Sequence, residues 1–423
     1  MTAFACPLVT PIDPQPAITP VRYLSRQPIV DARRRLFGYQ LLLGPGGSDN
    51  PEQATREMID HWLMLLPEAQ ARTVFVRCTR DALVQGLVTL LPAQKTVLGI
   101  APEIAPDADV IAHCDALRRQ GYRFSLDSFV PDDPRAPLLD RADFVHMSFP
   151  ASDYGVRHDV YRAAAGRQIL AGNVETEVEM LLLRGEGCSF FHGPFYAQPT
   201  LAHSAAVPKN YLIYLKLLST LDRDPADLRL VEKLVSADAA LCYRVLRLAN
   251  SALQAHPGEI STVREALLMV GDDAVRRMAT VAIAGALSGE RSAAILELAL
   301  SRARFCELLA PALAEEAAAM YLLGMISTLE SLLEAPLHSI LENLPLRGEM
   351  KSALTGDGSR AGCTLELVRA LEACNWIECQ RLQRQLGLRD GAIPAAHVEA
   401  LRWASTMIAT LAAPEKSSLS PIP

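Results

Sequence analysis

Few of the side chains that could do chemistry in this chain stand in a recognisable pattern. The nine cysteines form no Cys-x-x-Cys pair, and Cys374 and Cys379 have no second pair to match them. This usage predicts reduced thiols rather than a disulfide framework or a zinc site. The single His-Asp dipeptide, His158-Asp159, has no partner motif, and we interpret it as surface chemistry. The sequence holds no phosphate loop, no dinucleotide-binding glycine motif and no nucleophile elbow.

The composition excludes several classes of partner. The chain has 423 residues, a formal net charge of −7 and 50% apolar residues. An acidic balance argues against nucleic acid, because binding to phosphates needs a basic surface. No apolar run reaches membrane-spanning length, and the N-terminus lacks the pattern of a signal peptide. We therefore expect a cytoplasmic protein that binds neither nucleic acid nor membrane, with a length that suits two domains.

Strand-like and helix-like segments alternate in the first half of the chain. The strand candidates after Gln27–Val30 are Leu36–Leu43, Thr73–Val76, Thr96–Ile100, Arg123–Leu126, Phe144–Met147, Gln168–Ala171 and Ser189–Phe191. The helix candidates are Glu52–Leu66, Asp81–Leu91, Asp107–Arg119, Asp153–Ala165 and Thr176–Arg184. Such alternation predicts a TIM-like parallel β/α barrel. The strand Gln27–Val30 lies too close to its successor for a helical crossover, so this first pair should be antiparallel.

The second half reads as helical almost throughout. Its helix candidates are Asp227–Val235, Ala239–Leu248, Val263–Val270, Ala274–Leu287, Ile295–Leu313, Ala317–Leu333, Leu337–Asn343, Arg347–Thr355, Cys363–Leu386 and Ala395–Leu411. We therefore predict a barrel over 22–198, a linker over 199–209 and an all-α domain over 210–412. A proline-rich leader (1–21) and a polar tail (413–423) complete this division.

Two stretches carry resemblances to known families. Gly38-Tyr39-Gln40-Leu41-Leu42 resembles the second strand of an EAL domain, a barrel that hydrolyses cyclic diguanylate and has Glu-Ala-Leu after Gly-Tyr. Residues 238–251, which end in Asn250-Ser251, resemble an HDOD domain, a helical relative of the HD phosphohydrolases without their metal site. We interpret Asn250 and Ser251 as helix-capping residues. The order of the two domains resembles that of a bacterial two-domain signalling family.

The first resemblance implies a two-cation phosphodiesterase site, with carboxylates and an asparagine at the strand ends as ligands. The glutamate that names the family falls at Gln40, and the asparagine of the third strand falls at Arg77. The glutamate of the next strand falls at Gly99, and the arginine expected to grip phosphate falls at Gly44.

The later positions of the same resemblance keep two carboxylates. Of the paired aspartates Asp127 remains, beside Ser128, and the catalytic lysine falls at His146. The motif Ala-Glu-Gly-Val-Glu reads Ala171-Gly172-Asn173-Val174-Glu175, so Gly172 replaces its first glutamate and Glu175 keeps the second. A late glutamine falls at His192.

From these positions we expect no catalytic residue, no metal and no cofactor. Arg77 places a cation where a cation should bind, and a like-charge contact of a few ångströms costs kilocalories. Asp127 and Glu175 are expected to pair with Arg77 or to cap local backbone, and His146 to be a hydrogen-bonded histidine of a buried strand. In the helical half, Gly324–Thr328 stands where an HD enzyme has its ligands.

The sequence-based hypothesis is therefore a degenerate, catalytically inactive EAL barrel joined to an HDOD domain. It predicts regulation through contacts of the HDOD domain with other signalling proteins, with a homodimer as a further possibility, in cyclic-diguanylate signalling of motility, biofilm or virulence. It predicts no tight binding of cyclic diguanylate. Two alternatives stay open, namely a non-catalytic cyclic diguanylate receptor and a residual cyclic diguanylate phosphodiesterase.

Overall fold

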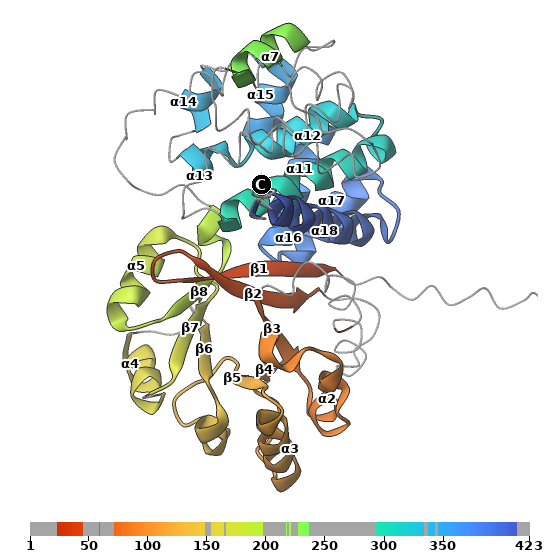
Figure 1. The fold of residues 1–423 in the computed structure, drawn as a ribbon. Coiled ribbons are helices and arrows are strands. Elements are labelled where there is room, and N and C mark those ends of the chain that lie inside the picture. Colours follow the sequence, from red (N-terminus) through yellow and green to blue (C-terminus); the bar gives the residue numbers. More distant parts are fainter. Residues whose placement is uncertain are drawn as a thin grey trace, which may run out of the picture.

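The computed structural model places a closed barrel of eight strands beneath a layer of helices (Figure 1). It describes residues 23–44, 59, 72–148, 154–164, 166–197, 217, 220, 227–236, 293–333, 337–342 and 346–412. The barrel strands are β1 Leu24–Asp31, β2 Leu36–Leu43, β3 Thr73–Cys78, β4 Thr96–Ile100, β5 Arg123–Leu126, β6 Phe144–Ser148, β7 Gln168–Gly172 and β8 Phe190–His192. The predicted β/α barrel is confirmed.

The first strand closes the ring in the direction that the sequence predicted. β1 pairs antiparallel with β2 and, on its other edge, antiparallel with β8, whereas β2 through β8 pair in parallel. An irregularity between Ile29 and Val30 shifts the register of β1 against β2. The hairpin between them turns through residues 32–35, where Arg34 takes a positive φ of 61°.

Helices of the described residues lie on the outside of the barrel, and three of the four begin at side-chain caps. They are α2 Arg80–Val84, α3 Ala108–Arg119, α4 Tyr154–Ala163 and α5 Glu177–Glu186. The carboxylate of Asp107 accepts a hydrogen bond from the Val110 amide at the start of α3. Thr176 and Glu179 form a capping box at the start of α5, which satisfies backbone donors that the first turn leaves free.

The interior of the barrel is built in layers. Ile29, Phe75, Val97, Phe144, Leu170 and Phe190 form one buried cluster, and Phe37 packs against it. Because these residues come from six different strands of a closed ring, they meet inside it. Side chains two positions apart on a strand share a face. The residues two positions away from this apolar cluster therefore also point into the barrel and form the next layer along its axis.

The helical half forms its own core around one long helix. Its elements are α7 Leu228–Ser236, α11 Ala293–Leu313, α12 Ala317–Ile326, α13 Leu329–Leu333, α14 Leu337–Glu342, α15 Gly348–Thr355, α16 Arg360–Glu372, α17 Trp376–Leu386 and α18 Ala392–Ala412. Buried residues of α11, α12, α16 and α18 form a continuous cluster. No helix in this described part, or in the described part of the barrel, is long and apolar enough to cross a membrane.

Three predicted helices are wrong in extent. Cys363–Leu386 is two helices, because the chain turns at Cys374, with a φ of 57°, and Asn375 caps α17. Ala317–Leu333 divides at Ser327, which ends α12. Asp81–Leu91 contains α2 and a 3₁₀ turn over Leu87–Leu90, with Gly86 in the left-handed region between them. Apolar spacing continues across each break, and so it concealed them.

Several predictions fall on parts of the chain outside the described residues. These are the leader 1–21, the linker 199–209, the tail 413–423, most of the helix Glu52–Leu66, and the three helices predicted between 239 and 287. The HDOD residues Asn250 and Ser251 lie there as well. Seven cysteines of the described residues are free thiols.

The two halves meet along the outer side of β1 (Figure 1). Arg26 forms a buried ion pair with Glu297 of α11, and the hydroxyl of Tyr39 donates to the same carboxylate. The guanidinium of Arg26 lies 4.3 Å from the centre of the Tyr39 ring. Tyr23 stacks on Trp376 of α17, with ring centres 6.0 Å apart. The first strand thus belongs to the packing of both halves.

A buried histidine in α18 should make stability depend on pH. Neither ring nitrogen of His397 has a hydrogen-bond partner within the described part of the chain, and burial, with Arg26 nearby, lowers its pKa to about 4. The unfolded chain, with a pKa of about 6.5, binds this proton first, so stability is lost as pH falls from about 6.5 towards 4. The loss amounts to about 2 kcal/mol at pH 5.

Urea unfolding at pH 7.5 and pH 5.0 measures this difference. We expect His397→Leu to lose about 2 kcal/mol less than the wild type between the two pH values. His158→Leu, at an exposed position of α4, serves as the control and should follow the wild type. Equal pH dependence of the wild type and His397→Leu would show that folding does not lower the pKa of His397.

Candidate functional site

A layer of mostly polar residues lies directly beyond the apolar interior of the barrel. In β3, β4, β6, β7 and β8 its members stand two positions after a residue of the apolar interior cluster. Residues of β1, β2 and β5 complete the layer. Its members are Gln27, Gln40, Arg77, Gly99, Ser125, His146, Gly172 and His192. This is the carboxyl end of the parallel strands, where TIM-like barrels carry their chemistry.

Two buried imidazoles meet at the centre of this layer. Nε2 of His192 lies 3.0 Å from Nε2 of His146, and Nδ1 of His192 lies 3.1 Å from Oε1 of Gln27. Burial lowers the pKa of both histidines, although Asp127 opposes the shift at His146. At neutral pH both rings are therefore uncharged, and an uncharged ring can accept a proton.

A buried carboxyl group lies beside the histidine pair. Asp127 follows β5, and its Oδ1 lies 3.9 Å from Nδ1 of His146 and accepts a hydrogen bond of 3.1 Å from Ser125. Burial raises the pKa of Asp127, against the opposing effects of His146 and Arg77. Nδ1 of His146 is buried and has no hydrogen-bond partner among the residues that the structure describes. We call Asp127, His146 and His192 the proton chain; the two histidines are within hydrogen-bond distance, whereas His146 and Asp127 are 3.9 Å apart.

A buried arginine holds the loop that follows Asp127. Arg135 is 1% exposed, pairs with Asp133 at 2.7 Å and donates to the carbonyls of Asp127 at 2.8 Å and Ile100 at 2.5 Å. Neither Arg135 nor Gln27 was a candidate in the sequence. Gln27 could have been found by counting two positions back from the interior residue Ile29, whereas Arg135 gave no such signal.

The remaining predicted positions stand apart from the histidine pair. Arg77 pairs with Glu103 at 3.1 Å, with 51% of its side chain exposed. Gln40 is buried and donates to the carbonyl of Leu41. Ser128 takes a φ of 50° in the loop after β5. Glu175 is exposed beyond β7, and its amide donates to Glu179.

Two glycines of the layer leave the space that neighbouring side chains fill. A Cβ atom on Gly99 would collide with the carboxylate of Asp127. A Cβ atom on Gly172 would collide with Nε2 of both His146 and His192. The resemblance places a glutamate at each of these positions, and in this chain the volume is taken by the groups that form the proton chain.

The residues present do not fit the two-cation centre that the resemblance implies. No group of three or more His, Cys, Asp or Glu side chains in the described part of the chain is placed to hold a metal ion. Asp127 lies beside this layer, and Arg77 brings a positive charge near it. Hard divalent cations take oxygen ligands, whereas the centre of this layer is two imidazoles.

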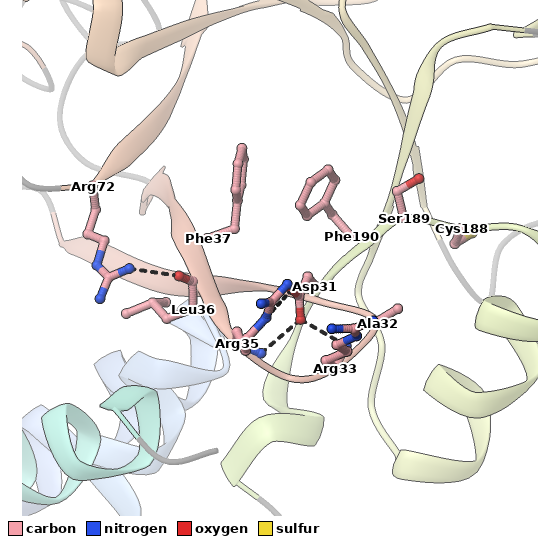
Figure 2. Close-up of a pocket in the computed structure, with 10 residues that line it drawn as sticks. All are labelled: Asp31, Ala32, Arg33, Arg35, Leu36, Phe37, Arg72, Cys188, Ser189 and Phe190. Atoms are coloured by element: carbon pink, nitrogen blue, oxygen red, sulfur yellow. Dashed lines mark hydrogen bonds and ion pairs between the residues drawn. The ribbon is translucent and has the colours of Figure 1, made fainter. Parts of the chain in front are cut away.

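A cavity lies at the amino end of the barrel, opposite the layer that holds the histidine pair. It has a volume of about 880 Å³ and includes three arginines, Arg33, Arg35 and Arg72, around the rings of Phe37 and Phe190 (Figure 2). Arg35 pairs with Asp31 at 2.7 Å, and Arg72 donates to the carbonyl of Leu36. The interior cluster of Phe75, Phe144 and Phe190 separates this cavity from the histidine pair.

Comparison with known proteins finds relatives that extend over both halves. The family model of the HDOD domain matches residues 207–337. The chain is 30% identical over 399 residues to the protein named cyclic di-GMP phosphodiesterase CdgJ of Vibrio cholerae, covering 90% of this chain and 92% of that relative. It is 25% identical over 405 residues to the uncharacterized protein YuxH of Bacillus subtilis, covering 91% and 98% of the two chains.

Solved structures resemble a smaller share of the chain. The crystal structure of the EAL domain of Mycobacterium smegmatis DcpA has a TM-score of 0.36 and 18% identity, covering 41% of this chain and 90% of that one. An EAL domain protein from Listeria monocytogenes has a TM-score of 0.34 and 18% identity, covering 41% and 87%.

Proposed function

This chain belongs to the bacterial two-domain signalling family in which an EAL domain precedes an HDOD domain, and on that premise we propose that it hydrolyses cyclic diguanylate. The observation that carries the proposal is the relative named a cyclic di-GMP phosphodiesterase, 30% identical over nine-tenths of both chains. The layer at the carboxyl end of the barrel supports it, because it brings Asp127, His146 and His192 together.

Two predictions from the sequence are corrected by this relative. The chain was expected to be no enzyme, and cyclic diguanylate was expected to bind poorly. A relative of this identity and coverage, named for the hydrolysis of that nucleotide, contradicts both expectations. They were wrong because each position was compared with one ligand set, without regard to the groups that replace it. The histidines at two of those positions meet in space and can handle a proton.

Hydrolysis of a phosphodiester has requirements that these side chains meet. The oxygen of a water molecule attacks phosphorus, one P–O bond breaks, and the proton that the water loses to a base is passed on to the departing oxygen. A neutral imidazole beside a carboxyl group can take up the first proton. In this chain the base is Nδ1 of His146, which faces Asp127 and lacks a hydrogen-bond partner among the described residues.

The negative charge of the phosphates needs a cation at the same end of the barrel. The guanidinium of Arg77 stands in the same layer, and its pair with Glu103 is exposed on both sides, at 51% and 62%. Exposed ion pairs are worth at most about 1 kcal/mol, so exchanging Glu103 for a phosphate is inexpensive. Arg77 therefore takes the phosphate-binding role in the proposal.

A turnover assay tests the proposal directly. The full-length protein is incubated with cyclic diguanylate in Mg²⁺, in Mn²⁺ and in a chelator, and the linear dinucleotide product is separated by chromatography. We expect product in proportion to protein and time in at least one of these buffers. Absence of product in all three, together with no saturable binding of the nucleotide by calorimetry, would contradict the proposal.

Other parts of the original hypothesis stay predictions. They are the domain limits 22–198 and 210–412, the binding of signalling proteins by the HDOD domain, and the homodimer. The family match over 207–337 supports a role of that domain in signalling. The buried contacts of β1 with α11 and α16 mean that any such partner acts on a helical half that touches the barrel.

A further inference from the structure

One side chain spans the boundary between the helical half and the histidine pair. Gln27 of β1 is 4% exposed, and its Nε2 donates a hydrogen bond of 3.0 Å to the main-chain carbonyl of Glu372. The same nitrogen lies 3.5 Å from Sγ of Cys374. On its other side, Oε1 of Gln27 lies 3.1 Å from Nδ1 of His192. Gln27 thus contacts both a helix end and the proton chain.

The carbonyl of Glu372 decides the orientation of this amide. A carbonyl oxygen can only accept, so the amide group that faces it must be the NH₂ and the amide oxygen must face His192. The amide oxygen Oε1 of Gln27 carries no hydrogen and can only accept. Nδ1 of His192 must therefore carry the proton and donate it to Oε1. Because burial keeps His192 neutral, its Nε2 is bare. The orientation of one amide fixes the tautomer of the first histidine.

The second histidine follows from the first. Nε2 of His192 is an acceptor, and so Nε2 of His146, 3.0 Å away, must donate its proton. In the neutral ring of His146 the lone pair then lies on Nδ1, the nitrogen that faces Asp127. This is the nitrogen to which the proposed hydrolysis assigns the role of base.

The end of α16 is held firmly by the helical half. Glu372 is the last residue of α16, where main-chain carbonyls have no partner within the helix. Its carboxylate forms a buried ion pair of 2.6 Å with Arg302 of α11, and Arg302 also donates to the hydroxyl of Ser327 at 2.8 Å. The acceptor that orients Gln27 is therefore fixed by three helices.

We propose that Gln27 is a positioning residue, through which the end of α16 sets the tautomers of His192 and His146 and so selects the basic nitrogen of the site. The assignment of tautomers stands on the contacts alone, whereas its effect on turnover rests on the proposed function. A shift of α16 that withdraws the Glu372 carbonyl frees the amide to turn over. The helical half then controls the site without touching the substrate.

Nitrogen-15 NMR of the full-length protein, labelled at histidine, tests the tautomers without any assay of activity. The spectra of His146→Gln and His192→Gln assign the signals. In the wild type at pH 7.5 we expect His192 protonated on Nδ1 and His146 protonated on Nε2. A proton on Nε2 of His192 would overturn the proposal.

Three variants test the control exerted by Gln27. Gln27→Met removes both hydrogen bonds and should give a mixture of tautomers, whereas Gln27→Glu keeps an oxygen acceptor and should leave His192 protonated on Nδ1. Gln383→Met is the matched control, because Gln383 also bonds across the boundary, to Tyr23, at a distance from the histidines. Unchanged tautomers in Gln27→Met would overturn the proposal.

Turnover separates this inference from the proposed function. We expect Gln27→Met to lower kcat by about 10-fold or more, with KM unchanged, and Gln27→Glu to restore most of it, because a wrong tautomer removes the base and leaves binding intact. If the NMR spectra show the expected tautomers but the wild type has no turnover, the proposed phosphodiesterase function is rejected and the positioning role of Gln27 remains supported. Turnover unaffected in Gln27→Met would reject the role in catalysis.

Discussion

Replacing His146 by glutamine is expected to lower kcat for cyclic diguanylate by about 10²–10⁴-fold, the range for loss of a general base. Glutamine keeps a polar side chain of similar reach, but it has no basic nitrogen beside Asp127 to take up the proton of the attacking water. The stability of the barrel should change little, because glutamine can still donate to Nε2 of His192. The measurement is initial-rate kinetics with the full-length protein, alongside circular dichroism to verify folding.

The control for this variant is another histidine of the barrel. His158 lies exposed in α4, away from the strand ends, so His158→Gln should keep the turnover of the wild type. Turnover in His146→Gln equal to that of His158→Gln would contradict the assignment of the base. The proton would then be handled by groups other than the chain of Asp127, His146 and His192.

Replacing Arg26 by methionine should remove about 3–5 kcal/mol from the free energy of unfolding. Arg26 and Glu297 have side chains only 3% and 9% exposed, so methionine would leave a buried carboxylate without its cation. The hydroxyls of Tyr39 and Ser405 still bond to Glu297, but hydroxyl groups do not neutralise its charge. Urea unfolding followed by circular dichroism measures the loss.

Two further variants separate the buried charge from the lost contacts. Arg381→Met breaks an ion pair with Glu378 whose side chains are 50% and 35% exposed, and it should leave the free energy of unfolding nearly unchanged because solvent screens such a pair. The double variant Arg26→Met/Glu297→Leu removes both charges and should recover much of the loss, as buried pairs do when both partners become apolar. A single-variant loss below 1 kcal/mol would mean that water reaches Glu297.

The order and nature of the barrel strands could be predicted from the sequence because each strand carries its own signal. Apolar runs at Thr96–Ile100 and Arg123–Leu126 are bounded by turn residues, and the structure places strands within the same limits. The antiparallel first pair followed from the length of its connection alone. These are local properties, and tertiary packing did not reverse them.

The contacts of the site could not be predicted because they depend on distant parts of the chain. His192 follows Gln27 by 165 residues, and Glu372 follows it by 345. No local pattern says that these three meet, and the φ of 57° at Cys374, which ends the helix near Gln27, leaves no trace in the apolar spacing. The sequence showed that ligand positions had changed, but only the fold shows that the replacements touch.

The packing of β1 against both the barrel and the helical half has a consequence for the way in which the chain folds. The strand Leu24–Asp31 finds one neighbour at once, in β2, but its other edge pairs with Phe190–His192 and its outer side packs on Glu297, while Tyr23, just before it, stacks on Trp376. During synthesis the first hairpin must therefore wait for the last helices before it is covered. Contacts so remote in sequence slow folding, and an uncovered strand edge invites association with other chains. This hairpin is thus made before the barrel and the helices that cover it, and it is protected only after them.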